Sequence, residues 1–191
     1  MIEDRRTYRE YRRKDLAAHG LTRVGLYNYM WMDCVRFQLR LRRIEYLYNT
    51  KKNNPLKALA WFVEEVVQHW ESVRLGFTIP KNVFGAGLCI VHRGTIVVSN
   101  KARVGDNCRI HPGTSIGDYD GAPEIGDNVY IGPGAKIFGP IKIGNNTAIG
   151  ANAVVNRSFE GNGTLAGIPA QRVSELGALE QGVFGERREN L

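Results

Sequence analysis

Two histidines, His92 and His111, are the side chains in the central part of this chain that are best suited to proton transfer. A neutral imidazole titrates near physiological pH and can take a proton from a hydroxyl group, so either residue is a candidate general base. Two histidines are too few for a three-histidine zinc site, and we expect no metal. Three cysteines, at positions 34, 89 and 108, indicate no disulfide framework and favour a cytoplasmic location.

The element that must position these histidines is a repeat of six residues. Residues 125–155 read IGDNVY, IGPGAK, IFGPIK, IGNNTA, IGANAV and then valine. An aliphatic residue opens each block, and a small or apolar residue stands fifth. A period of six fits neither a helix nor a two-faced strand, and the recurring glycine and asparagine indicate a tight corner after each short strand. The pattern predicts a coil of stacked strands with aliphatic ladders in a narrow core.

With IGPGAK, IGANAVV and LAGIPAQRV in this order, the chain resembles the hexapeptide-repeat acyltransferases over roughly residues 76 to 173. The resemblance implies a mainly β fold, a left-handed parallel β-helix of about eighteen residues per coil. Its left hand comes from the family alone, because parallel crossovers elsewhere are right-handed. The segment IPKNVFGAGLCIVHRGTIVV is most similar to the branch that holds serine acetyltransferases and the O-acetyltransferases of capsule and exopolysaccharide clusters.

The resemblance implies that His92 is the general base, since HRGTIVV matches the segment that carries the catalytic histidine of the family. Running the sixfold frame backward places His92 at a first, inward position, where its ring would be buried. The neighbouring residues 85–87, Gly-Ala-Gly, indicate instead that the first coil is irregular. His111 falls at a second position, where side chains leave the core, and we retain it as an acceptor-binding candidate.

The acceptor of the acetyl group is an open choice at this point. Serine acetyltransferases carry acids, an arginine and a histidine at places that match Val91, Phe77, Gly121 and Ala122 here. The spacing of nine between Ile116 and Ile125 predicts a projecting loop. It offers acceptor-binding groups: Asp118, Tyr119 and Asp120. We therefore expect a saccharide hydroxyl, with L-serine as the alternative and a non-catalytic scaffold as a further one.

For the acetyl donor, the resemblance implies acetyl-CoA lying along the wall between two subunits of a homotrimer. Small residues would admit the pantetheine arm, and basic residues would lie near the phosphates. The matching positions are Gly134, Ala135, Ala151, Asn156, Arg157 and Arg172.

The residues before the repeats predict a helical domain at 1–78, followed by the β-helix at 79–173 and a tail at 174–191. One helix has an apolar stripe at Leu26, Met30, Cys34, Phe37, Leu41, Ile44 and Tyr48. After an Asn54–Pro55 cap, a second helix has its stripe at Leu56, Leu59, Phe62, Val66, Trp70 and Val73 and stops at Gly76. Two such helices cannot bury both stripes in each other, so we expect them to pack also on the first coil or on another subunit.

The positive charge of the chain is concentrated in this helical part. Residues 1–80 hold 15 Lys and Arg against 9 Asp and Glu, an excess of 15 − 9 = 6. No nucleic-acid signature accompanies it, so we predict a solvated face or contact with a membrane surface and no nucleic acid. We also expect no signal peptide or membrane span, and trimers stacked through the helices remain an option.

Overall fold

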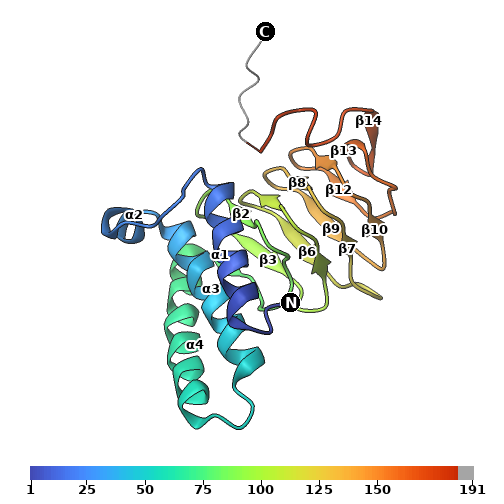
Figure 1. Ribbon diagram of the computed structural model, residues 1–191. Helices are drawn as coiled ribbons and strands as arrows, with labels where there is room; N and C mark the ends of the chain where they lie inside the picture. Colours follow the sequence, from blue (N-terminus) through green and yellow to red (C-terminus); the bar gives the residue numbers. More distant parts are fainter. Residues whose placement is uncertain (185–191) are drawn as a thin grey trace.

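The computed structural model describes residues 1–184, and residues 185–191 of the predicted tail lie outside the described residues. Four helices come first: α1 (Arg5–Ala18), α2 (Leu26–Trp31), α3 (Asp33–Thr50) and α4 (Pro55–Leu75). They cover one end of a β-helical coil, as Figure 1 shows. The caps of α4 are those predicted: the Asn54 side chain accepts from the Lys57 amide, and Gly76 ends the helix at a φ of 79°.

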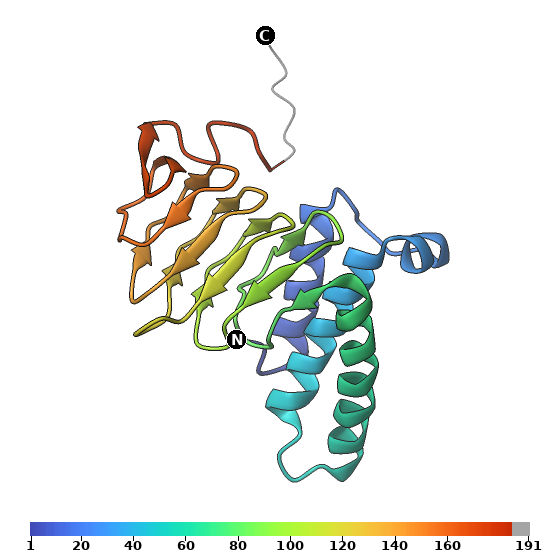
Figure 2. The same ribbon diagram turned by 180° about the vertical axis from the view of Figure 1, so that it is seen from behind.

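Every later strand belongs to one of three sheets that form the walls of the coil (Figure 2). Sheet A contains β1 (Phe77–Thr78), β3 (Ile96–Val98), β6 (Ser115–Gly117), β9 (Lys136–Phe138) and β12 (Val154–Val155). Sheet B contains β4 (Arg103–Val104), β7 (Glu124–Ile125) and β10 (Lys142–Ile143). Sheet C contains β2 (Cys89–Ile90), β5 (Arg109–Ile110), β8 (Tyr130–Ile131), β11 (Thr147–Ile149), β13 (Gly163–Gly167) and β14 (Ala170–Ser174). All pairs are parallel except β13 with β14, which closes the coil.

The predicted ladders form the core. In sheet C, Ile90, Ile110, Ile131 and Ile149 pair in register from coil to coil, and each is fully buried. The corners use asparagine and glycine at positive φ, as the repeat predicts; Asn107 and Asn128 adopt φ of 56° and 55° and their side chains are hydrogen-bonded. One core therefore runs the length of the coil.

The first coil departs from the strict frame at the segment that carries His92. Ile90 occupies the inward position in sheet C, and the next inward residue of that frame, Val98, follows after eight residues where the repeat has six. The two extra residues lengthen the turn at 91–95. His92 is consequently exposed on the outside of the coil, so the predicted irregular first coil is confirmed and the strict frame does not hold there.

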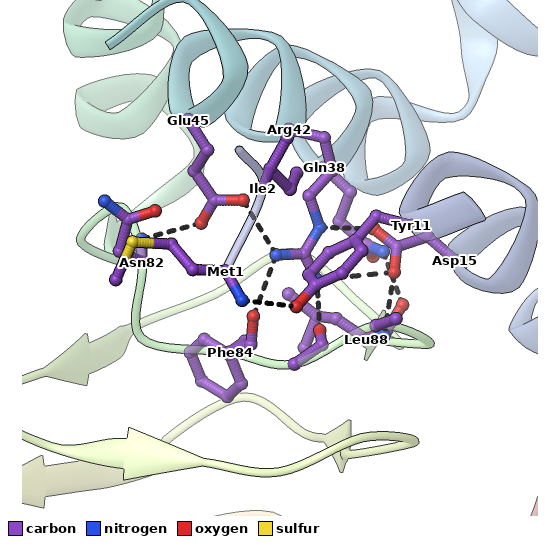
Figure 3. A network of polar contacts seen from close by, with 12 residues as sticks. Met1, Ile2, Tyr11, Asp15, Gln38, Arg42, Glu45, Asn82, Phe84 and Leu88 are labelled. Atoms are coloured by element: carbon purple, nitrogen blue, oxygen red, sulfur yellow. Dashed lines mark hydrogen bonds and ion pairs between the residues drawn. The ribbon is translucent and has the colours of Figure 1, made fainter. Parts of the chain in front are cut away.

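The helices dock on this first coil through a buried polar cluster (Figure 3). Arg42 of α3 is fully buried and donates to Asp15 of α1 over 2.8 Å, to Glu45 over 2.9 Å and to two carbonyl oxygens of the coil. Although burial opposes its charge, the carboxylates of Asp15 and Glu45 raise the pKa of Arg42. The Asp15 carboxylate also accepts from the amides of Gly87 and Leu88.

Gln38 of α3 extends this docking to strand β2. Its side-chain oxygen accepts from the Ile90 amide, and its nitrogen donates to the Leu88 carbonyl. Since β2 is the edge strand of sheet C, these bonds replace those that another coil would make. The helices and the coil share one hydrophobic cluster, which includes Phe37 and Leu41, so the predicted division at residues 78 and 79 stays a prediction.

Two expectations for the helices need correction. The helix predicted from Leu26 is broken at Met32 into α2 and α3, and Leu26 and Met30 are exposed. The stripe of α4 faces outward, with exposed fractions from 43% at Val66 to 77% at Leu56, so the first coil does not cover it and packing on another subunit stays a prediction. Periodicity identified both stripes but not what covers them. Within residues 1–184, no helix is long and apolar enough to cross a membrane.

Candidate active site

His92 lies at a corner where four turns of the coil are stacked. The turns at 91–95, 111–114, 132–135 and 150–153 lead from sheet C to sheet A, and we name this column the histidine corner. Backbone bonds hold them one above another: Gly113 to Thr95 at 2.6 Å, Gly134 to Pro112 at 2.9 Å, and Asn152 to Pro133 at 2.9 Å. His92 is at the end of the column that meets the helices.

His111 lies one coil above His92 in the same column. The two ring centroids are 6.5 Å apart, and the Tyr130 ring of the next coil is 5.0 Å from that of His111. Burial, then the positive charge of Arg109 and the nearby ring of His92, lower the pKa of His111. Its Nε2 is buried and has no hydrogen-bond partner within residues 1–184. The structure therefore brings the two histidines together and favours a neutral His111.

A pocket of about 540 Å³ adjoins His92, between the turn 91–95 and the helices. Its wall includes Trp31 of α2, Asp33 of α3 and Arg74 of α4. Asp33 accepts from Arg74 over 3.2 Å and from Arg93 over 3.4 Å, and it also pairs with Arg36. The side chains of Arg74 and Arg93 are 63% and 72% exposed, so the pocket carries a net positive charge beside His92.

Sequence reasoning missed Asp33 and Arg74 as site residues, because they come from helices far from His92 in the chain. Their positions at the ends of the predicted helices could have identified them. Asp33 starts a helix after the apolar run of α2, and Arg74 lies in the last turn before the Gly76 stop. Both helix ends therefore had to lie near the first coil.

Two of the cofactor candidates lie along the histidine corner. Ala151 is exposed there, three coils above His92, which is roughly 14 Å at the usual strand spacing. Gly134 lies between them at a φ of 76°, and a side chain on it would collide with Asn152. Ala135 is fully buried, so its side chain faces the core and only its backbone borders the corner.

The remaining candidates lie elsewhere on the single chain. Asn156 and Arg157 follow β12 at the corner between sheets A and B, where the 118–123 loop also projects. In that loop Tyr119 is 78% exposed, and a hydrogen bond from Lys101 lowers the pKa of Asp118. Sheet A, roughly 10 Å wide, separates this corner from His92.

Arg172 is on β14 and is already engaged. It pairs with Glu175, donates to the Gly161 carbonyl over 2.8 Å, and its guanidinium stacks 4.7 Å from the Phe159 ring centre. Within one chain, Arg172 is therefore apart from the histidine corner.

The cysteines have the character of packing residues. All three are free, and burial raises the pKa of each thiol, that of Cys34 to about 11. A thiolate is the nucleophilic form, so burial makes these groups inert at neutral pH. No group of three or more His, Cys, Asp or Glu side chains that could hold a metal ion occurs within residues 1–184.

Comparison with known proteins agrees with this geometry. Residues 122–157 match the family described as bacterial transferase hexapeptide (six repeats). A serine acetyltransferase of Mycobacterium tuberculosis is 37% identical over 59% of this chain and 51% of its own length. One of Staphylococcus aureus is 33% identical over 74% and 65%, respectively. A crystal structure of serine acetyltransferase in complex with coenzyme A from Brucella abortus has a TM-score of 0.72 at 27% identity and covers 91% of this chain and 70% of that one.

The coil is thus a left-handed parallel β-helix of the bacterial transferase hexapeptide class. The chain resembles the hexapeptide-repeat acyltransferases, and among them the serine acetyltransferases. It spans about half to two thirds of the length of the curated relatives it matches.

Proposed function

We propose that the protein is an acetyl-CoA-dependent O-acetyltransferase with His92 as general base. The observation that carries the proposal is the pocket in which an exposed histidine, at the end of a column of small residues, lies beside a cluster of one acid and two exposed arginines. His92 takes the proton of the acceptor hydroxyl as its oxygen attacks the thioester carbonyl carbon. The carbon–sulfur bond then breaks, and the leaving CoA thiolate takes that proton from His92.

The histidine corner supports the donor assignment. A related structure is described as a complex with coenzyme A. The surface along Gly134 and Ala151 lets an extended chain lie against the backbone for roughly 14 Å above His92. The thioester end of such an arm reaches the pocket. His111, one coil above, borders that path, and its buried Nε2 has no hydrogen-bond partner among the described residues 1–184.

For the acceptor, the relatives fit L-serine better than the saccharide that the loop residues suggested, because they are named serine acetyltransferases. The pocket supplies matching charges. Each guanidinium has five N–H donors, and Arg74 and Arg93 each use one on Asp33, which leaves donors for a carboxylate. The ammonium group takes the Asp33 oxygen that Arg93 contacts over 3.4 Å, the longest of these contacts.

A saccharide acceptor remains the second candidate on one observation. The pocket, at about 540 Å³, has an exposed apolar wall of Met30 and Trp31, and serine has no apolar surface that would need it. A sugar ring stacks on such a wall through its C–H face.

We also propose a homotrimer in which two subunits share each cofactor groove. Val97 and Phe138 expose apolar surface on sheet A, the wall between the two corners. A neighbouring copy packed against this wall would bring its own loop, with Asp118, Tyr119 and Asp120, or its Arg157 toward the first copy's groove. Light scattering that gives a monomer at micromolar concentration would refute this part.

The test is CoA release, followed with a thiol reagent, for L-serine against a panel of nucleotide sugars and oligosaccharides. Efficient turnover of serine supports the proposal. Arg93→Gln should then raise the KM for serine about tenfold or more and leave that for acetyl-CoA unchanged. Turnover of a saccharide alone would reject serine, and the absence of both transfer and slow thioester hydrolysis would leave the scaffold interpretation.

A further inference from the structure

A second cavity lies between helix α4 and the outer face of sheet A. Its volume is about 930 Å³, which is within the range of small-molecule sites. Strand β1, the edge strand of sheet A, borders it with Thr78, and Thr95 and Val97 of the neighbouring coil lie beside that strand. None of the described residues that line it also lines the pocket beside His92, so the two sites are separate.

The wall that α4 contributes carries polar groups without partners. Gln68 is 8% exposed, and neither its side-chain oxygen nor its nitrogen has a hydrogen-bond partner within residues 1–184. The Oε2 atom of Glu65, one turn earlier on the same side of α4, is also buried and has no partner in that part of the chain. A buried polar group without a partner raises the free energy of the folded chain, so a molecule that binds all three groups would stabilise it.

We propose that this cavity binds the adenine ring of an uncharged nucleoside, held by Gln68 and Glu65. A glutamine amide presents an N–H donor beside a carbonyl acceptor, and the adenine edge presents an acceptor, N7, beside the N6 amino group. The Nε2 of Gln68 donates to N7, and its Oε1 accepts one N6–H. The second N6–H is left for Glu65 Oε2, so the three unpaired groups of α4 match the three groups of that edge.

The charges around the cavity favour a neutral ligand. Glu65 and Lys81 are the one acid and the one lysine among the described residues that line it, and Glu65 Oε1 accepts from Lys81 over 2.9 Å. This pair leaves no net charge for a phosphate group, in contrast to the pocket beside His92 with its exposed arginines. It also leaves Glu65 Oε2 as an acceptor for an uncharged amino group.

The other walls fit the rest of a nucleoside. Tyr48 of α3 lines the cavity, and an aromatic ring is a surface on which a base stacks. Val73 of α4 and Val97 of sheet A add apolar surface, being 64% and 42% exposed. On the side of the coil, Thr78 and Asn100 supply groups that bind ribose hydroxyls. The cavity therefore combines base-binding groups on α4 with an apolar wall and hydroxyl-binding groups on the coil.

Isothermal titration calorimetry with adenosine and inosine tests the hydrogen-bond pattern. Inosine has an oxygen in place of the N6 amino group, and this oxygen would face the acceptors of Gln68 and Glu65, so inosine should bind about tenfold or more weakly than adenosine. Gln68→Leu should abolish adenosine binding. It should also raise the midpoint of thermal unfolding without ligand, because an apolar side chain replaces an unpaired amide. Gln171→Leu, a matched change at an exposed glutamine on β14, should leave binding unchanged.

Equal affinity for the two nucleosides, or no binding of adenosine at millimolar concentration, overturns the proposal, and neither measurement depends on a variant. Adenosine is also part of CoA, so the proposed cofactor groove is the competing site. Binding that is lost in Ala151→Trp and kept in Gln68→Leu would assign adenosine to that groove and reject the cavity. A lower unfolding midpoint for Gln68→Leu would show that the folded chain itself bonds the amide, which also contradicts the proposal.

Discussion

Replacing Asp15 by alanine should cost a large part of the stability of the protein. Asp15 is 2% exposed and accepts two bonds from Arg42 and two from backbone amides of the first coil. Its loss leaves the fully buried guanidinium of Arg42 with Glu45 as its one remaining carboxylate partner within the described residues. Breaking a buried ion pair costs about 3–5 kcal/mol, and each orphaned amide adds about 1 kcal/mol or more.

The sum, about 5–7 kcal/mol, is comparable with the whole free energy of unfolding of many domains. Asp15→Asn keeps an acceptor for the amides of Gly87 and Leu88 and removes only the charge, so we expect about 3 kcal/mol. Glu10→Ala is the control, because its pair with Lys14 is solvent-exposed and should be worth less than about 1 kcal/mol.

Urea unfolding followed by circular dichroism measures all three variants, with the slope of the transition checked for constancy. A loss below about 1.5 kcal/mol for Asp15→Ala at an unchanged slope would refute the view that this cluster holds the helices on the coil.

Three further predictions concern the site and its pH dependence. His92→Ala should lower turnover by about 10²–10⁴ while acetyl-CoA still binds, and unchanged turnover would move the base to His111. Ala151→Trp should raise the KM for acetyl-CoA, with Glu160→Trp on another part of the surface as its control; equal effects would remove Ala151 from the groove. Burial lowers the pKa of His19, so the unfolded chain binds the extra proton first and stability should fall as pH drops below about 6.5. His19→Gln should flatten that fall in urea titrations, and an unchanged pH profile would show that His19 does not contribute.

The coil could be predicted because each of its turns repeats one local rule. Ile125, Ile131 and Ile137 were assigned inward from spacing alone, and all are buried. The loop at 118–123 followed from the same count, since extra residues in a coil have no ladder to join. Where the sequence repeats every six residues, the local pattern is enough to predict the stacked coil.

His92 shows where the period stops being informative. The strict frame places it inward, and two extra residues between Ile90 and Val98 place it outside. A count of residues cannot tell which of two neighbours of a broken frame enters the core. Contacts with the helices determine which residue faces inward. Gln38 and Asp15 cap the first coil and bind the backbone of the segment before the turn.

The packing of the helices could not be predicted for a different physical reason. An apolar stripe lowers the free energy of folding only when something covers it, and sequence periodicity carries no information about the cover. On α4 the carboxylates of Glu64 and Glu71 form ion pairs with arginines of α3, so the polar side of α4 faces α3. Several charge-assisted bonds therefore hold the carboxylate side of α4 against α3.

The same network links α4 to the pocket beside His92. Arg36 joins Glu71 of α4 to Asp33 at the start of α3, and Asp33 in turn contacts Arg74 and Arg93 in the pocket beside His92. The register of α4 on α3 therefore sets where Arg74 stands relative to His92. The ion pairs that hold α4 on α3 therefore also fix the geometry of the acceptor pocket.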